Sequence, residues 1–333
     1  MNISVLNSGL LTTIQDLGRH GYQKYGVIVS GAMDTYAMRF ANILVGNNEN
    51  EGVLEITLVG PSLKLEKGTL FSITGGNISP TIKGRKISLG RPVYLNEDCV
   101  LNFGHCVAGC RSYLAIAGGF DVPEVMESKS TYLRAQFGGY NGRVLQKGDI
   151  LNIGAKSEKS NKIIKKLEET NKKDDFIITS WYVKESVVEE YNSAIIRVFP
   201  DRQFNDISDE SIKKFYNSKF TINNKSDRMG YRLNGEKIEL KVKLEMISEE
   251  VSIGTIQIPP DGNPIILLAD RQTTGGYPKI AHVASVDIQK IVQLKPNDSI
   301  TFKQISLKEA EKLYFEREKY ISELKKTIEL III

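Results

Sequence analysis

Short runs of alternating apolar and polar residues, each ended by glycine or proline, are the feature that most restricts how this chain can fold. Alternation with a period of two places the apolar side chains on one face of a strand. Clear examples are residues 53–58, 62–66, 69–73 and 93–95. The 28 glycines fall largely between such runs, as tight turns and bulges require. The pattern predicts a mainly β chain of barrels or sandwiches, rather than a parallel sheet with regular crossover helices.

Few segments have helical periodicity. Asp34 can cap a short helix whose apolar residues recur at helical spacing as far as Gly46. A stretch rich in lysine and glutamate separates two β-rich parts, and a final helix with an apolar stripe begins near Ser306. We therefore predict a first domain at 1–155, a charged linker at 156–176, a second domain at 177–305 and a C-terminal helix at 306–333.

An internal echo supports two related β domains. The tripeptide Thr-Gly-Gly occurs at 74–76 and again at 274–276, and Asp98 is echoed by Asp298. Gly-Pro at 60–61 is likewise followed, about 200 residues later, by Pro-Asp-Gly at 260–262. The spacing corresponds to one domain with its linker and favours duplication over chance.

Bulk properties exclude several functional classes. With 44 basic and 40 acidic residues the net charge is only +4, so a surface that tracks nucleic-acid phosphates is not expected. The sequence has neither a signal-peptide pattern at its start nor a run of about 18 apolar residues, so no membrane association is expected. Its three cysteines, an odd and low number, do not suggest a disulfide framework, and a cytoplasmic location is expected.

The segment from Asp270 to Lys279 is the richest in functional groups. Two adjacent glycines let the backbone approach a ligand closely, and hydroxyl, amide and cationic side chains flank them. Such a loop can hold an anionic oxygen or a polarised carbonyl, although a tight β-turn could require the same glycines. We predict that the segment supplies Arg271 and Lys279 as catalytic cations and binds substrate through the six residues that follow Arg271: Gln272, Thr273, Thr274, Gly275, Gly276 and Tyr277.

Other polar segments are weaker candidates. Asp16 and Arg19 could form an ion pair near a ligand, or a structural salt bridge at a turn. Arg228 has a similar Asp-Arg-Gly setting in the second half. The remaining candidates, assigned to substrate binding, are Ser30, Asp34, Ser128, Ser130 and Asp261. The sequence contains neither a P-loop nor a Gly-x-Ser-x-Gly elbow, and its histidines and cysteines lack the spacing of a metal site. Charge stabilisation and positioning are therefore favoured over covalent catalysis.

Several of these segments together resemble one family. The runs 12–19 and 30–34 are similar to the opening signature of the family of 5-oxoprolinase C subunits, also called the KipA or biotin-dependent carboxyltransferase-like family. The resemblance extends from about residue 5 to about residue 303 and includes these further segments: 41–47, 54–61, 113–119, 138–149, 226–230, 254–262 and 271–279. The family usually has Gly-Ser-Arg-Ser-Thr at 127–131, where this chain has a lysine at 129 and so lacks the planar, two-pronged guanidinium.

The resemblance implies two cyclophilin-like β-barrel domains and a complex with 5-oxoprolinase subunits B and A. The implied reaction is ATP-dependent cleavage of 5-oxoproline (pyroglutamate) to glutamate, with ATP and Mg²⁺ bound together with the partner subunits. Arg19, Arg228, Arg271 and Lys279 would then bind the substrate carboxylate and the phosphate. Gly275 and Gly276 would offer backbone N–H groups, while Asp16, Asp34 and Asp261 would orient the cations or hold the magnesium ion.

Two alternatives remain open. Related domains in urea carboxylase transfer a carboxyl group from biotin to urea, so the chain could act on urea or a related amide. It has no Met-Lys-Met biotinylation site, so the biotin would not be attached to this chain. The other alternative is a non-enzymatic regulatory partner of the B subunit, a KipI-like protein.

Overall fold

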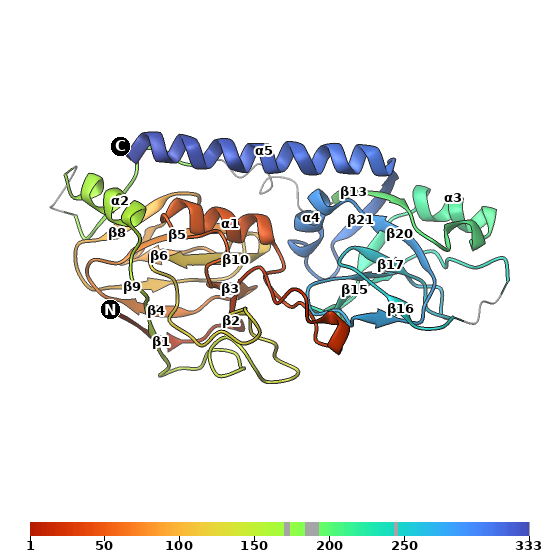
Figure 1. Cartoon of the computed structure of the whole chain (residues 1–333), viewed down its shortest axis with the longest axis horizontal. Helices are drawn as coiled ribbons and strands as arrows, with labels where there is room; N and C mark the ends of the chain where they lie inside the picture. The colour runs from red at the N-terminus through yellow and green to blue at the C-terminus, as the bar shows by residue number, and fades with distance from the viewer. Residues whose placement is uncertain (170–173, 184–192, 243–245, 333) are drawn as a thin grey trace. The chain divides into compact units, whose positions relative to one another are not determined.

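The computed structural model describes residues 1–169, 174–183, 193–242 and 246–332, and most of its regular structure is β (Figure 1). The chain divides into two compact units. The first contains Met1–Arg19, Asp34–Glu189 and Ser322–Ile333, and the second contains His20–Met33 and Glu190–Ile321. The prediction of a mainly β chain with two β domains is confirmed. No pattern in the sequence had indicated that 20–33 would belong with the second half of the chain.

Two six-stranded sheets form the first unit. One sheet has the order β11 (Ile150–Asn152), β1 (Asn2–Asn7), β4 (Ser62–Leu65), β9 (Cys99–Asn102), β6 (Thr81–Ile82), β7 (Arg85–Lys86). The other has the order β12 (Phe176–Ile178), β8 (Pro92–Leu95), β5 (Leu70–Asn77), β10 (Ala108–Ile116), β3 (Val53–Thr57), β2 (Leu11–Gln15). Neighbouring strands of both sheets pair antiparallel, and the four runs predicted from alternation correspond to β3, β4, β5 and β8.

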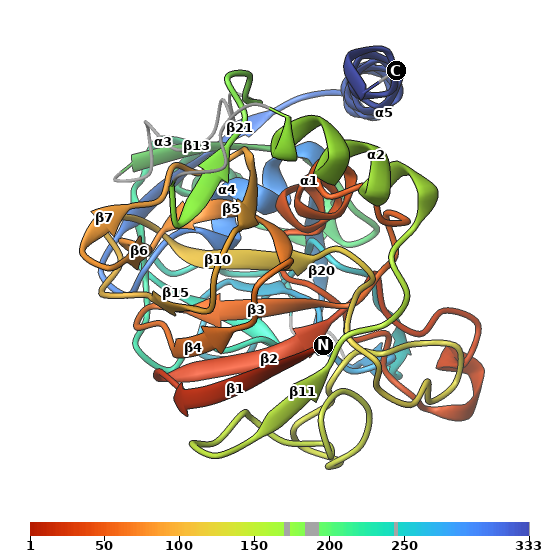
Figure 2. The ribbon, with the colours of Figure 1, turned by 90° about the vertical axis from the view of Figure 1, so that its left-hand side faces the viewer.

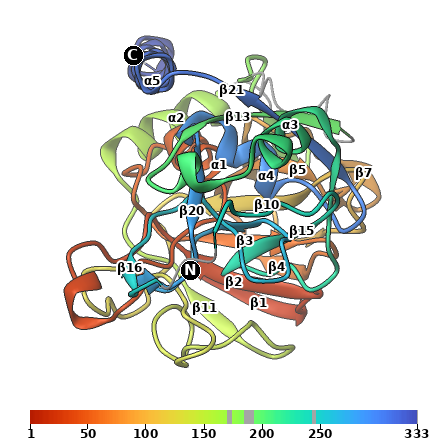
Figure 3. The same cartoon turned by 90° about the vertical axis from the view of Figure 1, so that its right-hand side faces the viewer.

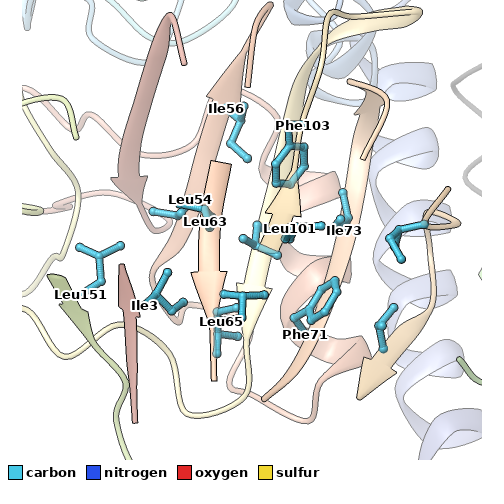
Figure 4. Packing of buried hydrophobic residues seen from close by; sticks show 14 of the residues in the cluster. Ile3, Leu54, Ile56, Leu63, Leu65, Phe71, Ile73, Leu101, Phe103 and Leu151 are labelled. Carbon is cyan, nitrogen blue, oxygen red and sulfur yellow. The ribbon is translucent and has the colours of Figure 1, made fainter. Parts of the chain in front are cut away.

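One hydrophobic core joins the two sheets. Alternate residues of the longer strands are buried in it, such as Leu54 and Ile56 of β3 and Leu63 and Leu65 of β4. Figure 4 shows these side chains together with Phe71 and others from both sheets. The period-two alternation of the sequence is therefore the direct cause of this packing.

Two helices accompany these sheets. α1 (Thr35–Leu44) packs on β5 and β10 (Figure 2), and the Asp34 side chain accepts a hydrogen bond from the Ala37 amide, which confirms the predicted cap. α2 (Glu158–Glu168) lies within the predicted charged linker and is capped by Ser157. The three cysteines are free thiols, as expected from their number.

The second unit is a closed seven-stranded barrel. Its strand order is β13 (Ser193–Pro200), β20 (Lys279–Val283), β17 (Thr255–Gln257), β18 (Ile265–Leu267), β15 (Gly230–Asn234), β14 (Phe220–Ile222), β21 (Ser299–Gln304). β13 and β21 close the barrel as a parallel pair, whereas the other pairs are antiparallel. A separate ribbon joins β16 (Glu249–Glu250) to β19 (Thr274–Gly275).

The second unit also contains short helices, of which Figure 3 labels α3 and α4. They are η1 (Gln23–Tyr25), η2 (Phe204–Asp206), α3 (Asp209–Asn217), η3 (Ser285–Asp287) and α4 (Ile288–Val292). Phe215 of α3 stacks on Phe302 of β21 with ring centroids 4.4 Å apart, which fixes α3 to the barrel.

The last element is the continuous helix α5 (Leu307–Ile332), which confirms the predicted C-terminal helix (Figure 1). Its residues as far as Ile321 belong to the second unit and those from Ser322 onward to the first. Among the described residues, no helix combines the length and the apolar character needed to cross a membrane.

Candidate functional site

A cavity of about 390 Å³ lies in the second unit. Strand residues from β15, β17 and β18 line it together with the ribbon strand β19 and the residues that flank it. This volume is within the range of about 300–1,000 Å³ typical of small-molecule sites. Six of the predicted residues line the cavity: Arg271, Gln272, Thr274, Gly275, Gly276 and Tyr277.

Arg271 is the most distinctive of these residues. Burial lowers the pKa of its guanidinium to about 10. It donates to two backbone carbonyls, those of Val251 at 3.4 Å and Leu268 at 3.3 Å, and it forms no salt bridge with a carboxylate of the described residues. A guanidinium that has lost water without gaining a carboxylate is suited to bind an anionic ligand through its planar fork.

Residues 274–277 line this cavity and are called its rim, and Lys279 follows them closely in the chain. Its ammonium donates to a Glu249 carboxylate oxygen at 2.6 Å and to the Glu250 carbonyl at 3.3 Å. The hydrogen bond from Lys279 lowers the pKa of Glu249. Because Glu249 is paired with Gly275 in the ribbon, Lys279 holds β16 and, through it, β19. Lys279 is 4% exposed and does not line the cavity, and the catalytic role assigned to it stays a prediction.

The two rim glycines have different surroundings. A Cβ atom at Gly275 would lie 2.6 Å from the Nε2 atom of Gln257, so any other residue at this position would force the Gln257 carboxamide to move. At Gly276 the nearest atom would be the Ser248 hydroxyl at 3.5 Å, which leaves ordinary space. The carbonyl of Thr273 accepts a hydrogen bond from the Val251 amide and supports the rim from outside the cavity lining.

Arg228 and Ser30 meet in a buried cluster within the same unit. Arg228 donates from two nitrogens to both carboxylate oxygens of Asp270, at 2.9 and 3.1 Å, and to the Gly31 carbonyl at 2.6 Å. The Ser30 hydroxyl donates to Asp270 at 2.8 Å. These bonds attach the segment His20–Met33 to the barrel. Neither Arg228 nor Ser30 lines the cavity.

Asp261, another predicted ligand residue, lies in an exposed turn outside the cavity lining. Hydrogen bonds from the side chain and the backbone of Asn263 lower the pKa of its carboxyl group. This arrangement is a local turn contact.

In the first unit, Asp16, Ser128 and Ser130 form a second buried cluster. The Asp16 carboxylate accepts hydrogen bonds from both serine hydroxyls and from the Lys129 amide at 2.6 Å. Arg19 is completely buried, donates to the Ser130 carbonyl at 2.5 Å and lies 4.8 Å from the centre of the Phe137 ring. Asp34 is occupied as the cap of α1. The catalytic and binding roles assigned to these residues stay predictions.

Sequence reasoning did not select three polar residues that line the cavity: Asp227, Arg232 and Gln257. Asp227 directly precedes Arg228, and the pattern pointed to the arginine, whereas the aspartate is the one that lines the cavity. Gln257 is the last residue of β17 (Thr255–Gln257) and lies between two isoleucines, Ile256 and Ile258. An amide between two apolar residues, at a position expected to be buried, was the signal that could have identified it.

Comparisons with known proteins agree on a relationship. A family model described as "Carboxyltransferase domain, subdomain A and B" matches residues 25–304. The chain is 35% identical to the C subunit of 5-oxoprolinase from Haemophilus influenzae, over 98% of this chain and 99% of that protein. It is 34% identical to the protein of the same name from Escherichia coli, with 97% of each covered.

Larger proteins contain a similar region. The chain is 34% identical to "Urea amidolyase" of Saccharomyces cerevisiae, over 93% of this chain and 17% of that protein. A crystal structure of the Kluyveromyces lactis urea carboxylase matches with a TM-score of 0.84 and 32% identity, over 96% of this chain and 29% of that one.

Proposed function

Because the chain belongs to the carboxyltransferase subdomain A and B family, we propose that it is the C subunit of an ATP-dependent 5-oxoprolinase. In this proposal it works in the cytoplasm with subunits A and B to open 5-oxoproline to L-glutamate. Two relatives of nearly the same length carry that subunit name. Under this proposal the substrate binds in the cavity of the second unit, and one observation supports that position. The Arg271 guanidinium there is desolvated and has no carboxylate partner among the described residues.

The chemistry of the substrate explains why such a site is needed. Amide resonance makes the lactam carbonyl of 5-oxoproline a poor electrophile, so that water attacks it slowly. Phosphorylation of the amide oxygen by ATP would activate the carbon, and charge would then build up on oxygens near the ring. Arg271 would hold the substrate carboxylate through its two-pronged fork and keep the ring in one orientation. Lys279, through Glu249 and β16, would keep the rim in place.

ATP and Mg²⁺ are proposed to act together with the partner subunits. Within the ranges that the structure describes, no three His, Cys, Asp or Glu side chains gather into a metal site. No step of the proposal therefore runs through a metal ion held by this chain.

The test is Arg271→Ala in the complex reconstituted with subunits A and B. We expect ATP-dependent release of glutamate from 5-oxoproline to fall at least about tenfold, because a charged hydrogen bond to the substrate contributes about 1.5–3 kcal/mol. The melting temperature is expected to stay close to that of the wild type. Wild-type turnover in this variant would reject the assignment.

Arg85→Ala is the matched control. Arg85 is a half-exposed arginine of the first unit that lies 3.5 Å from a carboxylate oxygen of Asp175 and 4.2 Å from the centre of the Phe176 ring. Exposed contacts of these kinds contribute about 0–1 kcal/mol each, so turnover is expected to stay at the wild-type level and stability to change little.

Biotin-dependent carboxyl transfer is the second candidate, favoured by the similarity to urea carboxylase. It predicts turnover with urea and a biotinyl carrier supplied on another chain. It also predicts no release of glutamate from 5-oxoproline when subunits A and B are present. A regulatory partner of the B subunit would bind that protein and show turnover with neither substrate.

A further inference from the structure

Gln257 is a buried amide to which the proposed reaction assigns no role. It lies at the end of β17, is only 4% exposed, and lines the same cavity as Arg271. Its Nε2 atom donates to the Tyr277 carbonyl at 3.2 Å. Because a carbonyl can only accept, this contact fixes which end of the carboxamide is nitrogen.

Gly275 packs directly against this carboxamide. A Cβ atom at that position would lie 2.6 Å from Nε2 and 3.3 Å from Oε1 of Gln257. Any side chain there would displace or cover the amide. Because position 275 is a glycine, no side chain from it lies between the Gln257 carboxamide and the cavity that both residues line.

A carboxamide offers a complementary pattern to one class of ligand. The primary amide presents an acceptor oxygen and two N–H donors, of which the Tyr277 carbonyl occupies one. A lactam holds its N–H and C=O on the same side of the ring, since the ring forces the amide into the cis form. The two amides can thus form a pair of reciprocal hydrogen bonds, N–H to O=C in each direction. An open-chain secondary amide, which prefers the trans form, cannot make both.

We propose that Gln257 is a specificity residue that recognises the cyclic amide of the substrate, while Arg271 binds its carboxylate. This inference rests on the proposed function and makes it more specific, because it assigns the ligand class as a small lactam acid. Removal of a site's hydrogen-bonding group penalises only ligands that use this group. Substitution of Gln257 should therefore weaken the binding only of ligands that contain the cyclic amide. Substitution of Arg271 should weaken the binding of every ligand that contains the carboxylate.

The experiment compares 5-oxoproline with cyclopentanecarboxylate, which has a five-membered ring and a carboxylate but no amide. In the reconstituted complex, the KM for 5-oxoproline and the competitive inhibition constant of cyclopentanecarboxylate are measured for each variant. Gln257→Met is expected to raise the KM at least about tenfold and to leave the inhibition constant within about twofold. Arg271→Met is expected to raise both constants.

Gln203→Met is the control for a purely structural effect. Gln203 accepts a hydrogen bond from the Lys279 amide at 3.0 Å and does not line the cavity. It anchors backbone next to the rim, as Gln257 does, so its replacement tests whether a loosened rim alone changes ligand choice. We expect the ratio of the two constants to stay at the wild-type value.

Two outcomes would overturn the inference. Equal losses for both ligands in Gln257→Met would mean that Gln257 only anchors the rim through Tyr277. No change for either ligand would mean that the amide does not contact the substrate. If the wild-type complex releases no glutamate, the proposed function fails. Calorimetric binding of the same two compounds to the complex would still test the role of Gln257 separately.

Discussion

The same tripeptide, Thr-Gly-Gly, occurs once in each unit and has a different environment in each. At 74–76 it lies within the buried strand β5, where the Thr74 hydroxyl donates to the Ala37 carbonyl at 2.7 Å. Gly75 has a φ of +80° next to a shift in the pairing with β10. At 274–276 the tripeptide starts in the two-residue strand β19 and lines the cavity, and Thr274 and Gly276 are exposed.

This contrast shows that a motif alone does not decide between scaffold and site. What separates the two copies is whether their polar groups already have partners inside the protein. The same distinction separates two arginines of the second unit. Arg228 has both oxygens of Asp270, whereas Arg271 has two backbone carbonyls at long distance. Satisfied groups stabilise the fold, and incompletely satisfied ones remain available to a ligand.

The two arginines give the largest expected difference. Arg228→Met leaves the buried carboxylate of Asp270 without its partner and should lower the free energy of unfolding by about 3–5 kcal/mol. Arg271→Met removes a charge whose burial is not compensated by a carboxylate of the described residues, and should leave stability unchanged or raise it. Urea unfolding of the two variants and the wild type measures both effects. Similar losses in the two variants would mean that both arginines belong to the scaffold.

One glycine from each Thr-Gly-Gly copy gives a smaller expected difference in the free energy of unfolding. Gly75→Ala places a side chain at a positive φ inside a buried strand, and should cost about 1–3 kcal/mol of unfolding free energy. Gly276→Ala adds a methyl group to an exposed residue, in ordinary van der Waals contact with the Ser248 hydroxyl at 3.5 Å, so its effect should lie within about 0.5 kcal/mol. Thermal or urea unfolding provides the measurement. A destabilised Gly276→Ala variant would mean that the rim is part of the scaffold.

The elements could be predicted well where periodicity and capping determine them. The alternation at 53–58 became β3, and Asp34 capped α1 as its position indicated. The site could be predicted only in part. Arg271 and its neighbours followed from their chemistry, but Gln257, at the end of the short strand β17, lies 14 residues earlier in the chain and outside that polar segment. The interior role of Arg228 depends on Asp270 and on the backbone of Gly31, which is 197 residues away in the chain. Contacts of that range come from tertiary folding, and local patterns do not encode them.

The smallest expected effect is the pH dependence of ligand binding to Arg271. Burial holds its pKa at about 10, below its ordinary value, so the cation loses its proton at a lower pH in the folded protein than in the unfolded chain. A carboxylate ligand needs the charged form. The KM for 5-oxoproline should therefore be flat up to about pH 9, double at about pH 10 and rise about tenfold for each further unit.

Arg271→Lys sharpens this test. A free lysine loses its proton at about pH 10.4, and burial at the same position lowers that value further. The rise in KM should then move below about pH 10, into a range where the complex is easier to assay. If the profile is the same in wild type and Arg271→Lys, the titrating group is another residue. The rim of the second Thr-Gly-Gly run would then bind its ligand without the cation that distinguishes it from the first.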